Sequence, residues 1–144
     1  METKIVINTD GGARGNPGPA ACAFVIRTEG KIIYQDSKFL GVATNNQAEY
    51  HGVLTALLYL SENKKNFSGK TIVFILDSEL VARQLSGEYK TKNPDLKMLL
   101  AKAKVLEKNI KAIFFYTVTS REKNRTADFL VNQELDEKEK ISRY

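Results

Sequence analysis

The sequence predicts an α/β layer fold around a mixed five-stranded sheet. Strand-like apolar runs separated by short glycine turns fill residues 4–39, and the apolar spacing changes to the helical period after Gly41. The run at residues 71–76 is continuously apolar, which is typical of a strand covered on both faces and therefore central in its sheet. From there helical and strand patterns alternate, as they do in layered α/β proteins.

Three strands are predicted at the start of the chain. Residues 4–9 end at Asp10, which two glycines follow, and this pattern is typical of a strand that ends in a turn. The second and third strands cover residues 21–27 and 31–39, joined by a short turn at residues 28–30. Because these connections are short, we expect three antiparallel neighbours.

The remaining elements follow from apolar periodicity and capping signals. Thr44 and Gln47 match a capping box, and apolar residues then recur at helical spacing, so a helix is expected from about Asn45 to residue 62. Pro94 favours another helix start. The later predicted elements are a strand at 71–76, helices at 78–88 and 93–108, a strand at 110–118 and a helix at 126–137.

Length and composition are those of one globular domain. The 144 residues are 42% hydrophobic and 27% charged, which suffices for a full core, and no linker or repeat divides them. We therefore expect one domain over residues 1–144, with a core at about 3–137 and a charged tail at about 138–144. No apolar run is long enough for a membrane span and no signal peptide is visible, so a cytoplasmic location is expected. Cys22 lies in an apolar stretch and is expected to be buried.

The formal net charge of +5 is unevenly distributed along the chain. Residues 60–125 hold 14 basic and 7 acidic residues, whereas residues 1–59 hold five of each sign. A regional positive field suits a polyanionic partner such as nucleic acid, but it also solubilises proteins that bind none.

Four carboxylates are placed where they could converge on one end of the sheet. Asp10 and Asp77 end predicted strands, Glu49 lies in the second turn of the first helix, and Asp128 lies at the start of the last helix. Each alone fits ordinary turn or capping chemistry. Together they would repel one another unless a cation compensated them. Hard oxygen ligands suit Mg²⁺ or Mn²⁺, and two such ions ~3.5 to 4 Å apart can promote phosphodiester cleavage.

Four blocks of sequence resemble those of ribonuclease H type 1 and its reverse-transcriptase-associated relatives. The blocks are residues 10–19, 44–49, 77–78 and 121–128, in the family's order and spacing. The resemblance, closest to the short archaeal and bacterial branch without a basic protrusion, implies an RNase H-like three-layer fold. In that fold, three antiparallel strands and two parallel strands carry helices on both faces. It also implies an endonuclease with two Mg²⁺ ions per site, or Mn²⁺, that cuts the RNA strand of RNA/DNA hybrids and leaves 3′-hydroxyl and 5′-phosphate ends. A monomer without membrane or protein partner is expected.

The resemblance also implies roles for individual residues. Asp10, Glu49, Asp77 and Asp128 match the family's metal-binding acids. Glycines would let the backbone approach the RNA, short amides would bind 2′-hydroxyls, and Thr44 matches a residue that holds a DNA phosphate. The expected nucleic-acid contacts are Gly11, Gly12, Ala13, Arg14, Asn16, Thr44, Asn45, Asn46, Lys90 and Lys92.

The chain departs from the family at two places. Many members carry a histidine in the loop before the last acid, whereas here Arg121 and Glu122 occupy that loop and are the candidates for catalytic support. The single histidine, His51, lies roughly 200° around the helix from Glu49 and is expected to point away from the acids. The family's tryptophan-rich basic handle is also missing, so a modest affinity for hybrid is expected.

Two alternative functions stay open at this stage. The first is a binding module with this fold that grips duplexes or proteins without turnover; the four acids argue against it, because they would repel phosphates. The second is a nuclease with broader substrates, such as double-stranded RNA or those of a retroelement. The missing handle and loop histidine leave this second alternative open.

Overall fold

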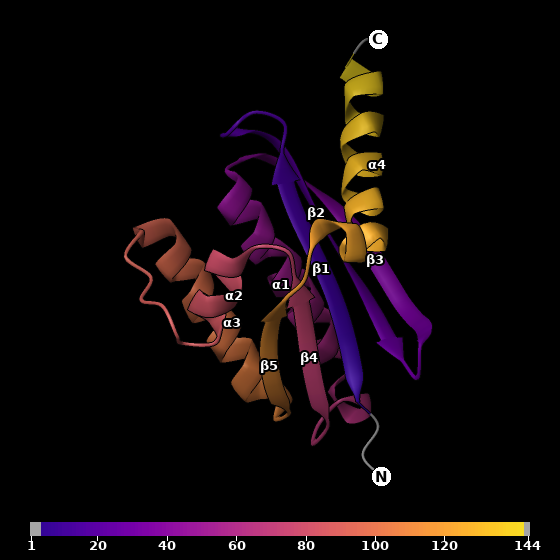
Figure 1. Ribbon diagram of the computed structural model, residues 1–144, viewed down its shortest axis with the longest axis vertical. Helices are drawn as coiled ribbons and strands as arrows, with labels where there is room; N and C mark the ends of the chain where they lie inside the picture. Colours follow the sequence, from indigo (N-terminus) through magenta and orange to yellow (C-terminus); the bar gives the residue numbers. More distant parts are fainter. Residues whose placement is uncertain (1–3, 143–144) are drawn as a thin grey trace.

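Five strands form one mixed sheet in the order β3-β2-β1-β4-β5 (Figure 1). The computed structural model describes residues 4–142. β1 pairs antiparallel with β2 and parallel with β4; β2 pairs antiparallel with β3, and β4 pairs parallel with β5. The predicted combination of three antiparallel and two parallel strands is therefore confirmed. The strands are β1 (Ile5–Ala13), β2 (Gly18–Thr28), β3 (Lys31–Ala43), β4 (Thr71–Leu76) and β5 (Ile113–Val118).

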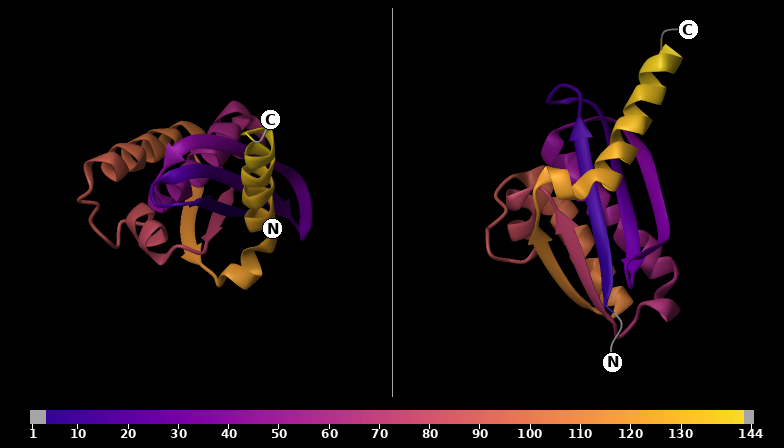
Figure 2. Two further views of the ribbon diagram at one scale, coloured as in Figure 1. Left: turned by 90° about the horizontal axis from the view of Figure 1, so that it is seen from above. Right: turned by 45° about the vertical axis from the view of Figure 1, so that its right-hand side comes forward.

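Helices cover both faces of this sheet, which makes three layers (Figure 2). The first three helices share one core with the sheet, and α4 packs on the opposite face against β2, β1 and β3. Among residues 4–142, no helix is both long and apolar enough to cross a membrane. The helices are α1 (Asn45–Glu62), α2 (Glu79–Leu85), α3 (Pro94–Ile110) and α4 (Arg125–Ser142), with 3-10 turns η1 (Lys64–Asn66) and η2 (Arg121–Asn124).

The alternation of side chains along β2 separates the two cores. Phe24 and Ile26 point to the large core beneath α1, whereas Ala21 and Ala23 point to the small cluster beneath α4. Successive side chains of a strand face opposite sides, so one strand serves both layers. The alanines leave room for α4 to lie close to the sheet. Cys22 is buried, as the sequence predicts.

Several element ends differ from the predicted ones. β1 continues to Ala13, so Asp10 lies within the strand instead of after it. The two glycines predicted a turn, yet they pair with β2 as strand residues. α2 ends earlier than predicted, at Leu85, because Gly87 adopts a left-handed conformation with φ of 83° just beyond it.

The last helix is longer than predicted and continues to Ser142. Arg14, just past the end of β1, forms ion pairs with Asp136 and Glu139, each at 2.7 Å. These contacts hold the distal half of α4 against the β1–β2 turn. Residues 1–3 and 143–144, which include the end of the predicted charged tail, lie outside the described part of the chain.

Candidate active site

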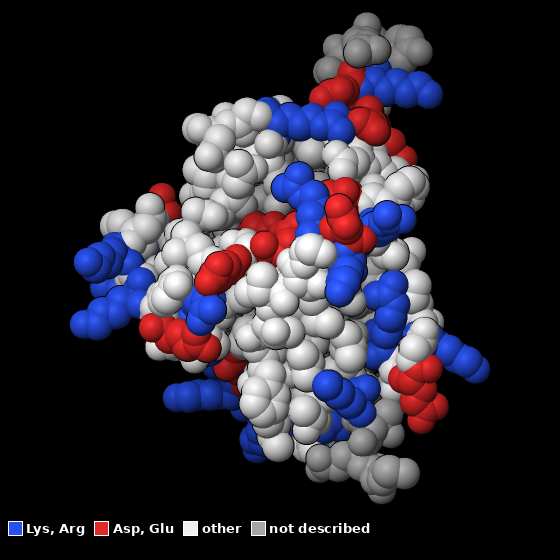
Figure 3. Space-filling model, viewed as in Figure 1, with Lys and Arg blue, Asp and Glu red and all other residues white. Residues whose placement is uncertain are grey.

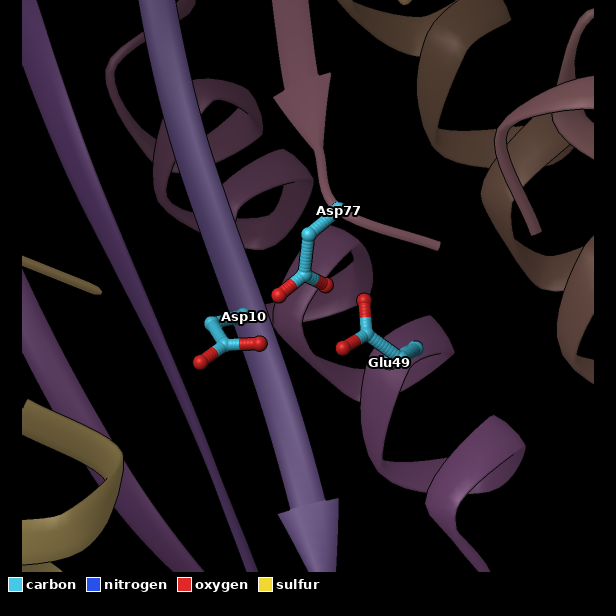
Figure 4. Close-up of side chains that lie close together, drawn as sticks. All are labelled: Asp10, Glu49 and Asp77. Atoms are coloured by element: carbon cyan, nitrogen blue, oxygen red, sulfur yellow. The ribbon is translucent and has the colours of Figure 1, made fainter. Parts of the chain in front are cut away.

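Three carboxylates meet at the end of the sheet where β1 passes the last residue of β4. Asp10 comes from β1, Asp77 follows β4 directly, and Glu49 comes from α1, so each belongs to a different element (Figure 4). One oxygen of each side chain lies within 4.8 Å of the corresponding oxygens of the other two. This spacing matches a set of ligands arranged around a metal ion.

A close approach between β1 and α1 brings Asp10 and Glu49 together. A Cβ on Gly11 would lie 2.1 Å from the Ala48 carbonyl oxygen, and one on Gly52 would lie 2.8 Å from the Asp10 carbonyl oxygen. Both distances are far shorter than real contacts, so only glycine fits at either position. The capping box fixes the residue at which α1 begins. Gln47 N–H donates to Thr44 Oγ1 at 3.1 Å, and Thr44 N–H donates to Gln47 Oε1 at 2.9 Å.

The two carboxylates at this approach are buried. Asp10 is 5% exposed and Glu49 is 6% exposed. Glu49 Oε1 accepts a hydrogen bond from the Gly11 N–H at 3.2 Å, whereas Glu49 Oε2 is buried and has no hydrogen-bond partner among residues 4–142. A buried carboxylate oxygen without a donor is unfavourable unless a cation binds it.

The electrostatics of the cluster lead to the same conclusion. Burial raises the pKa of Asp10 to about 7, and the charges of Asp77 and Asp128 act in the same direction, against the lowering effect of contacts with Glu49 and the Gly11 N–H. Burial, followed by the charges of Asp10 and Asp77, raises the pKa of Glu49 well above its ordinary value. Asp10 and Glu49 therefore ionise together only when a positive charge compensates them.

Asp128 lies near the cluster but outside the group of three. It stands in the first turn of α4 and lines the same cleft of about 590 Å³ as Asp10, Glu49 and Asp77. Figure 3 shows acidic side chains gathered in the upper part of this face with basic side chains beside them. The sequence grouped four acids; the structure brings three together and places the fourth on the wall of their cleft.

Eight of the ten residues expected to contact nucleic acid line one or both of two neighbouring pockets. Five of them line the carboxylate cleft beside Asn46, which borders both pockets: Gly11, Gly12, Ala13, Arg14 and Asn45. The second pocket, of about 240 Å³, is lined by Asn16, Thr44 and Asn46 together with Asn93 and Asp95.

Two of the predicted amides already bind backbone. Asn45 N–H donates to Asn16 Oδ1 at 3.0 Å, and Ala13 N–H donates to Asn45 Oδ1 at 2.9 Å. These bonds join the β1–β2 turn to the start of α1. Asn16 and Asn45 therefore shape the cleft as well as line it.

The basic residues predicted to contact nucleic acid differ in whether their charge is already paired within the protein. Besides its two ion pairs, Arg14 donates to Asn132 Oδ1 at 3.2 Å, so its charge is balanced within the protein. Lys90 and Lys92 are exposed in the loop between α2 and α3 and do not line the cleft. Any contact they make with a duplex therefore lies beyond the carboxylates.

The two candidates in the loop before α4 point in different directions. Arg121 Nε lies 3.7 Å from Asp77 Oδ2, with the arginine side chain 81% exposed. Glu122 lines a separate pocket with Asn8 and Arg27. Burial and the charges of neighbouring lysines lower the pKa of His51, which does not line the cleft. Of the two loop candidates, only Arg121 lies beside a site carboxylate.

Sequence reasoning missed a buried pair of asparagines behind the site. Asn8 Nδ2 donates to Asn124 Oδ1 at 3.1 Å, and Asn124 Nδ2 donates to the Thr9 carbonyl at 2.8 Å. The one signal in the sequence is an asparagine inside an otherwise apolar strand pattern.

Comparison with known proteins agrees with this geometry. Residues 8–134 match the protein family described as reverse transcriptase-like. The fold and the carboxylate cluster agree with a domain of that class. More closely, ribonuclease HI of Halobacterium salinarum is 38% identical over 129 residues, which are 89% of this chain and 62% of that protein. The crystal structure of LC11-RNase H1 in complex with RNA/DNA hybrid has 40% identity and a TM-score of 0.85, over 90% of this chain and 94% of that one. The chain belongs to the ribonuclease H type 1 family.

A longer relative shows the same domain within a larger protein. The bifunctional protein Rv2228c of Mycobacterium tuberculosis is 36% identical over 135 residues, which are 92% of this chain but 36% of the relative. The chain therefore spans about a third of the length of this mycobacterial relative.

Proposed function

We propose that this protein is a metal-dependent endoribonuclease that cuts the RNA strand of RNA/DNA hybrids and leaves 3′-hydroxyl and 5′-phosphate ends. The observation that carries the proposal is the cluster of Asp10, Glu49 and Asp77, with oxygens within 4.8 Å of one another. A protein that only bound duplexes would gain nothing from buried carboxylates that repel phosphates.

The donor set fits Mg²⁺ or Mn²⁺. All ligand atoms are carboxylate oxygens, and the unpartnered Glu49 Oε2 offers a site for a hard cation. Asp10, Glu49, Asp77 and Asp128 would hold two ions. When bound, such ions lower the pKa of a water and stabilise the charge on the leaving oxygen.

We propose that the hybrid lies along the carboxylate cleft. A relative with 40% identity forms a complex with RNA/DNA hybrid. The backbone at residues 11–14 would approach the RNA, and the amides of Asn16, Asn45 and Asn46 would face its 2′-hydroxyls. Thr44 would hold a phosphate of the DNA strand from the second pocket, and Lys90 and Lys92 would follow phosphates farther along.

Arg121 takes the supporting role in this proposal. Its guanidinium lies beside Asp77 and offers only hydrogen-bond donors, so it has no acceptor with which to act as a base. It can stabilise the negative charge that develops on the phosphate. Glu122 lines another pocket and has no part in this step.

A cleavage assay on three labelled duplexes tests the function. With Mg²⁺ or Mn²⁺, RNA/DNA should be cut in its RNA strand, while RNA/RNA and DNA/DNA stay intact. Asp10→Asn, prepared in parallel, controls for contaminating nuclease. Binding of hybrid without cleavage would indicate a binding module, and cleavage of RNA/RNA would indicate the broader nuclease.

The remaining proposals concern the whole protein. We propose a single domain over residues 1–144, with a core at about 3–137 and a tail at about 138–144, that acts as a monomer in the cytoplasm. Light scattering of the purified protein and fractionation of cells measure the last two properties directly.

A further inference from the structure

Of the four carboxylates, Asp128 is the one whose position does not follow from the main core. Asp10, Glu49 and Asp77 stand on β1, on α1 and directly after β4, all of which pack around the large core. Asp128 stands on α4, on the opposite face of the sheet (Figure 1). The apolar contacts of α4 with Ala21 and Ala23 begin farther along the helix, at Leu130 and Val131. In its first turn Ala127 is fully buried, but so small a side chain leaves room for a second, polar anchor.

Asn124 supplies that anchor. It is 1% exposed and stands directly before α4, one helical turn ahead of Asp128. Its Nδ2 donates to the carbonyl of Thr9, the residue before Asp10 in β1, at 2.8 Å. The pairing of β1 with β4 ends at Asn8, so the Thr9 carbonyl lies just past the last pair of that ladder. The Asn124 side chain thus links the segment just before Asp128 to the residue just before Asp10.

A second contact fixes the orientation of the Asn124 amide. Asn124 Oδ1 accepts from Asn8 Nδ2 at 3.1 Å, and Asn8 Oδ1 accepts from Arg27 Nη1 at 3.0 Å. Arg27 Nη2 also donates to Thr126 Oγ1 at 3.2 Å, inside the first turn of α4. The chain of bonds runs from β2 through β1 to the loop and back to the helix. Rotation of the Asn124 amide would break both of its own bonds, the one from Asn8 and the one to the Thr9 carbonyl.

We propose that Asn124 is a positioning residue that holds Asp128 in the metal site by tying the start of α4 to β1. The proposal rests on the proposed function in one respect, the assignment of Asp128 as a metal ligand. Hydrogen bonds behind a ligand orient it, and their loss weakens metal binding without removal of any ligand.

A double-mutant cycle on metal binding tests this role. Calorimetric titration of the intact protein with Mn²⁺ alone measures affinity for wild type, Asn124→Ala, Asp128→Asn and the double variant. We expect Asn124→Ala to weaken Mn²⁺ binding by about tenfold in the wild-type background. In the Asp128→Asn background it should have little further effect, because the ligand that it positions is already lost.

A purely structural role gives a different result. Loss of one buried hydrogen bond elsewhere, in Gln84→Ala, which removes the acceptor of the Tyr50 hydroxyl at 2.7 Å, should leave the titration unchanged. Equal weakening by Asn124→Ala in both backgrounds, or none in either, would overturn the proposal. If Asp128→Asn alone leaves Mn²⁺ binding unchanged, the assignment of Asp128 fails and the proposal with it.

A milder variant covers the case in which Asn124→Ala does not fold. Thr126→Val keeps the side-chain shape and removes only the bond from Arg27, so it should weaken Mn²⁺ binding in the same direction by a smaller factor. It should also lose this effect in the Asp128→Asn background. The double-mutant cycle can also behave as expected while the wild type cuts no duplex. That result would count against the proposed nuclease activity and still support the positioning role of Asn124.

Discussion

The Gly11 N–H donates a hydrogen bond of 3.2 Å to Glu49 Oε1, at a point where β1 and α1 are too close for any side chain. Gly11 thereby contributes its backbone N–H to one carboxylate and its small size to the packing of the helix that carries that carboxylate. The neighbouring Gly12 has open space, because no atom of residues 4–142 beyond its chain neighbours would lie within 4 Å of a Cβ added there.

Gly11→Ala should therefore be strongly destabilising and Gly12→Ala should not. The added methyl at Gly11 would lie 2.1 Å from the Ala48 carbonyl oxygen, so α1 must move, at a cost of about 2 kcal/mol or more. Gly12→Ala should change the unfolding free energy by about 1 kcal/mol at most. Urea unfolding followed by circular dichroism measures both, and equal effects would contradict the close approach.

Asp10 should make stability depend on pH in the absence of metal. Burial raises its pKa from 3.8 to about 7, so the native protein holds this proton more tightly than the unfolded chain does. The resulting stabilisation is complete below about pH 4 and is lost as the pH rises through about 7. Asp10→Asn removes this ionisation. In the presence of a chelator, the stability of this variant relative to wild type should therefore increase between about pH 4 and pH 8, by up to about 4 kcal/mol.

Thermal unfolding across that pH range measures the difference. Addition of Mn²⁺ at about pH 8 should stabilise the wild type and have less effect on Asp10→Asn, because the variant lacks one ligand. A stability difference that stays constant with pH would mean that Asp10 ionises in the native protein as it does in the unfolded chain.

Two residues of the loop before α4, Arg121 and Glu122, can be compared with His51 of α1 by substitution. Arg121→Ala should lower kcat by about tenfold or more with little change in KM, and Arg121→Lys should restore part of the loss, because the charge near Asp77 returns. Glu122→Gln and His51→Ala should stay within about tenfold of wild type, since neither residue lines the cleft. Steady-state kinetics on hybrid at fixed salt measure all four variants. A larger loss in His51→Ala, without a loss of stability, would place the histidine in the chemistry.

The fold was predictable where its signals are local. The capping box of Thr44 and Gln47 depends on residues three apart, and the predicted start of α1 at Asn45 is confirmed. The predicted end of β1 was wrong, because two glycines usually signal a turn. Here Gly11 stays in the strand and allows α1 to pack closely against it. The length of α4 depends on ion pairs with Arg14, which no local pattern reveals.

The same distinction applies to the site. Asp10, Glu49 and Asp77 could be grouped in advance because acids at strand ends and in a first helix converge when the elements pack. Asn8 and Asn124 are 116 positions apart, and an asparagine carries no pattern that names its partner. Their contact follows from the tertiary fold alone.

The position of the hybrid can be tested through the salt dependence of binding. Lys90→Ala with Lys92→Ala should weaken binding to hybrid and to DNA duplex alike, and should reduce the salt slope by up to about two units, because each lost phosphate contact releases about one counterion fewer. The matched control is Lys64→Ala with Lys65→Ala, which removes two exposed charges from η1, at the opposite end of β4 from Asp77. This control should leave the slope unchanged.

Asn46→Ala should differ in kind from the lysine variant. Asn46 borders both pockets, whereas Asn45 also holds the Ala13 N–H, so Asn46 is the cleaner probe of contacts with the sugar. Its loss should reduce the preference for hybrid over DNA duplex at a nearly constant salt slope, because it removes a neutral hydrogen bond to a 2′-hydroxyl. Affinity measured against salt for both duplexes separates the two classes of contact. An unchanged slope in the variant of Lys90 and Lys92 would place the duplex away from that loop, and an unchanged preference in Asn46→Ala would move the RNA strand away from the start of α1.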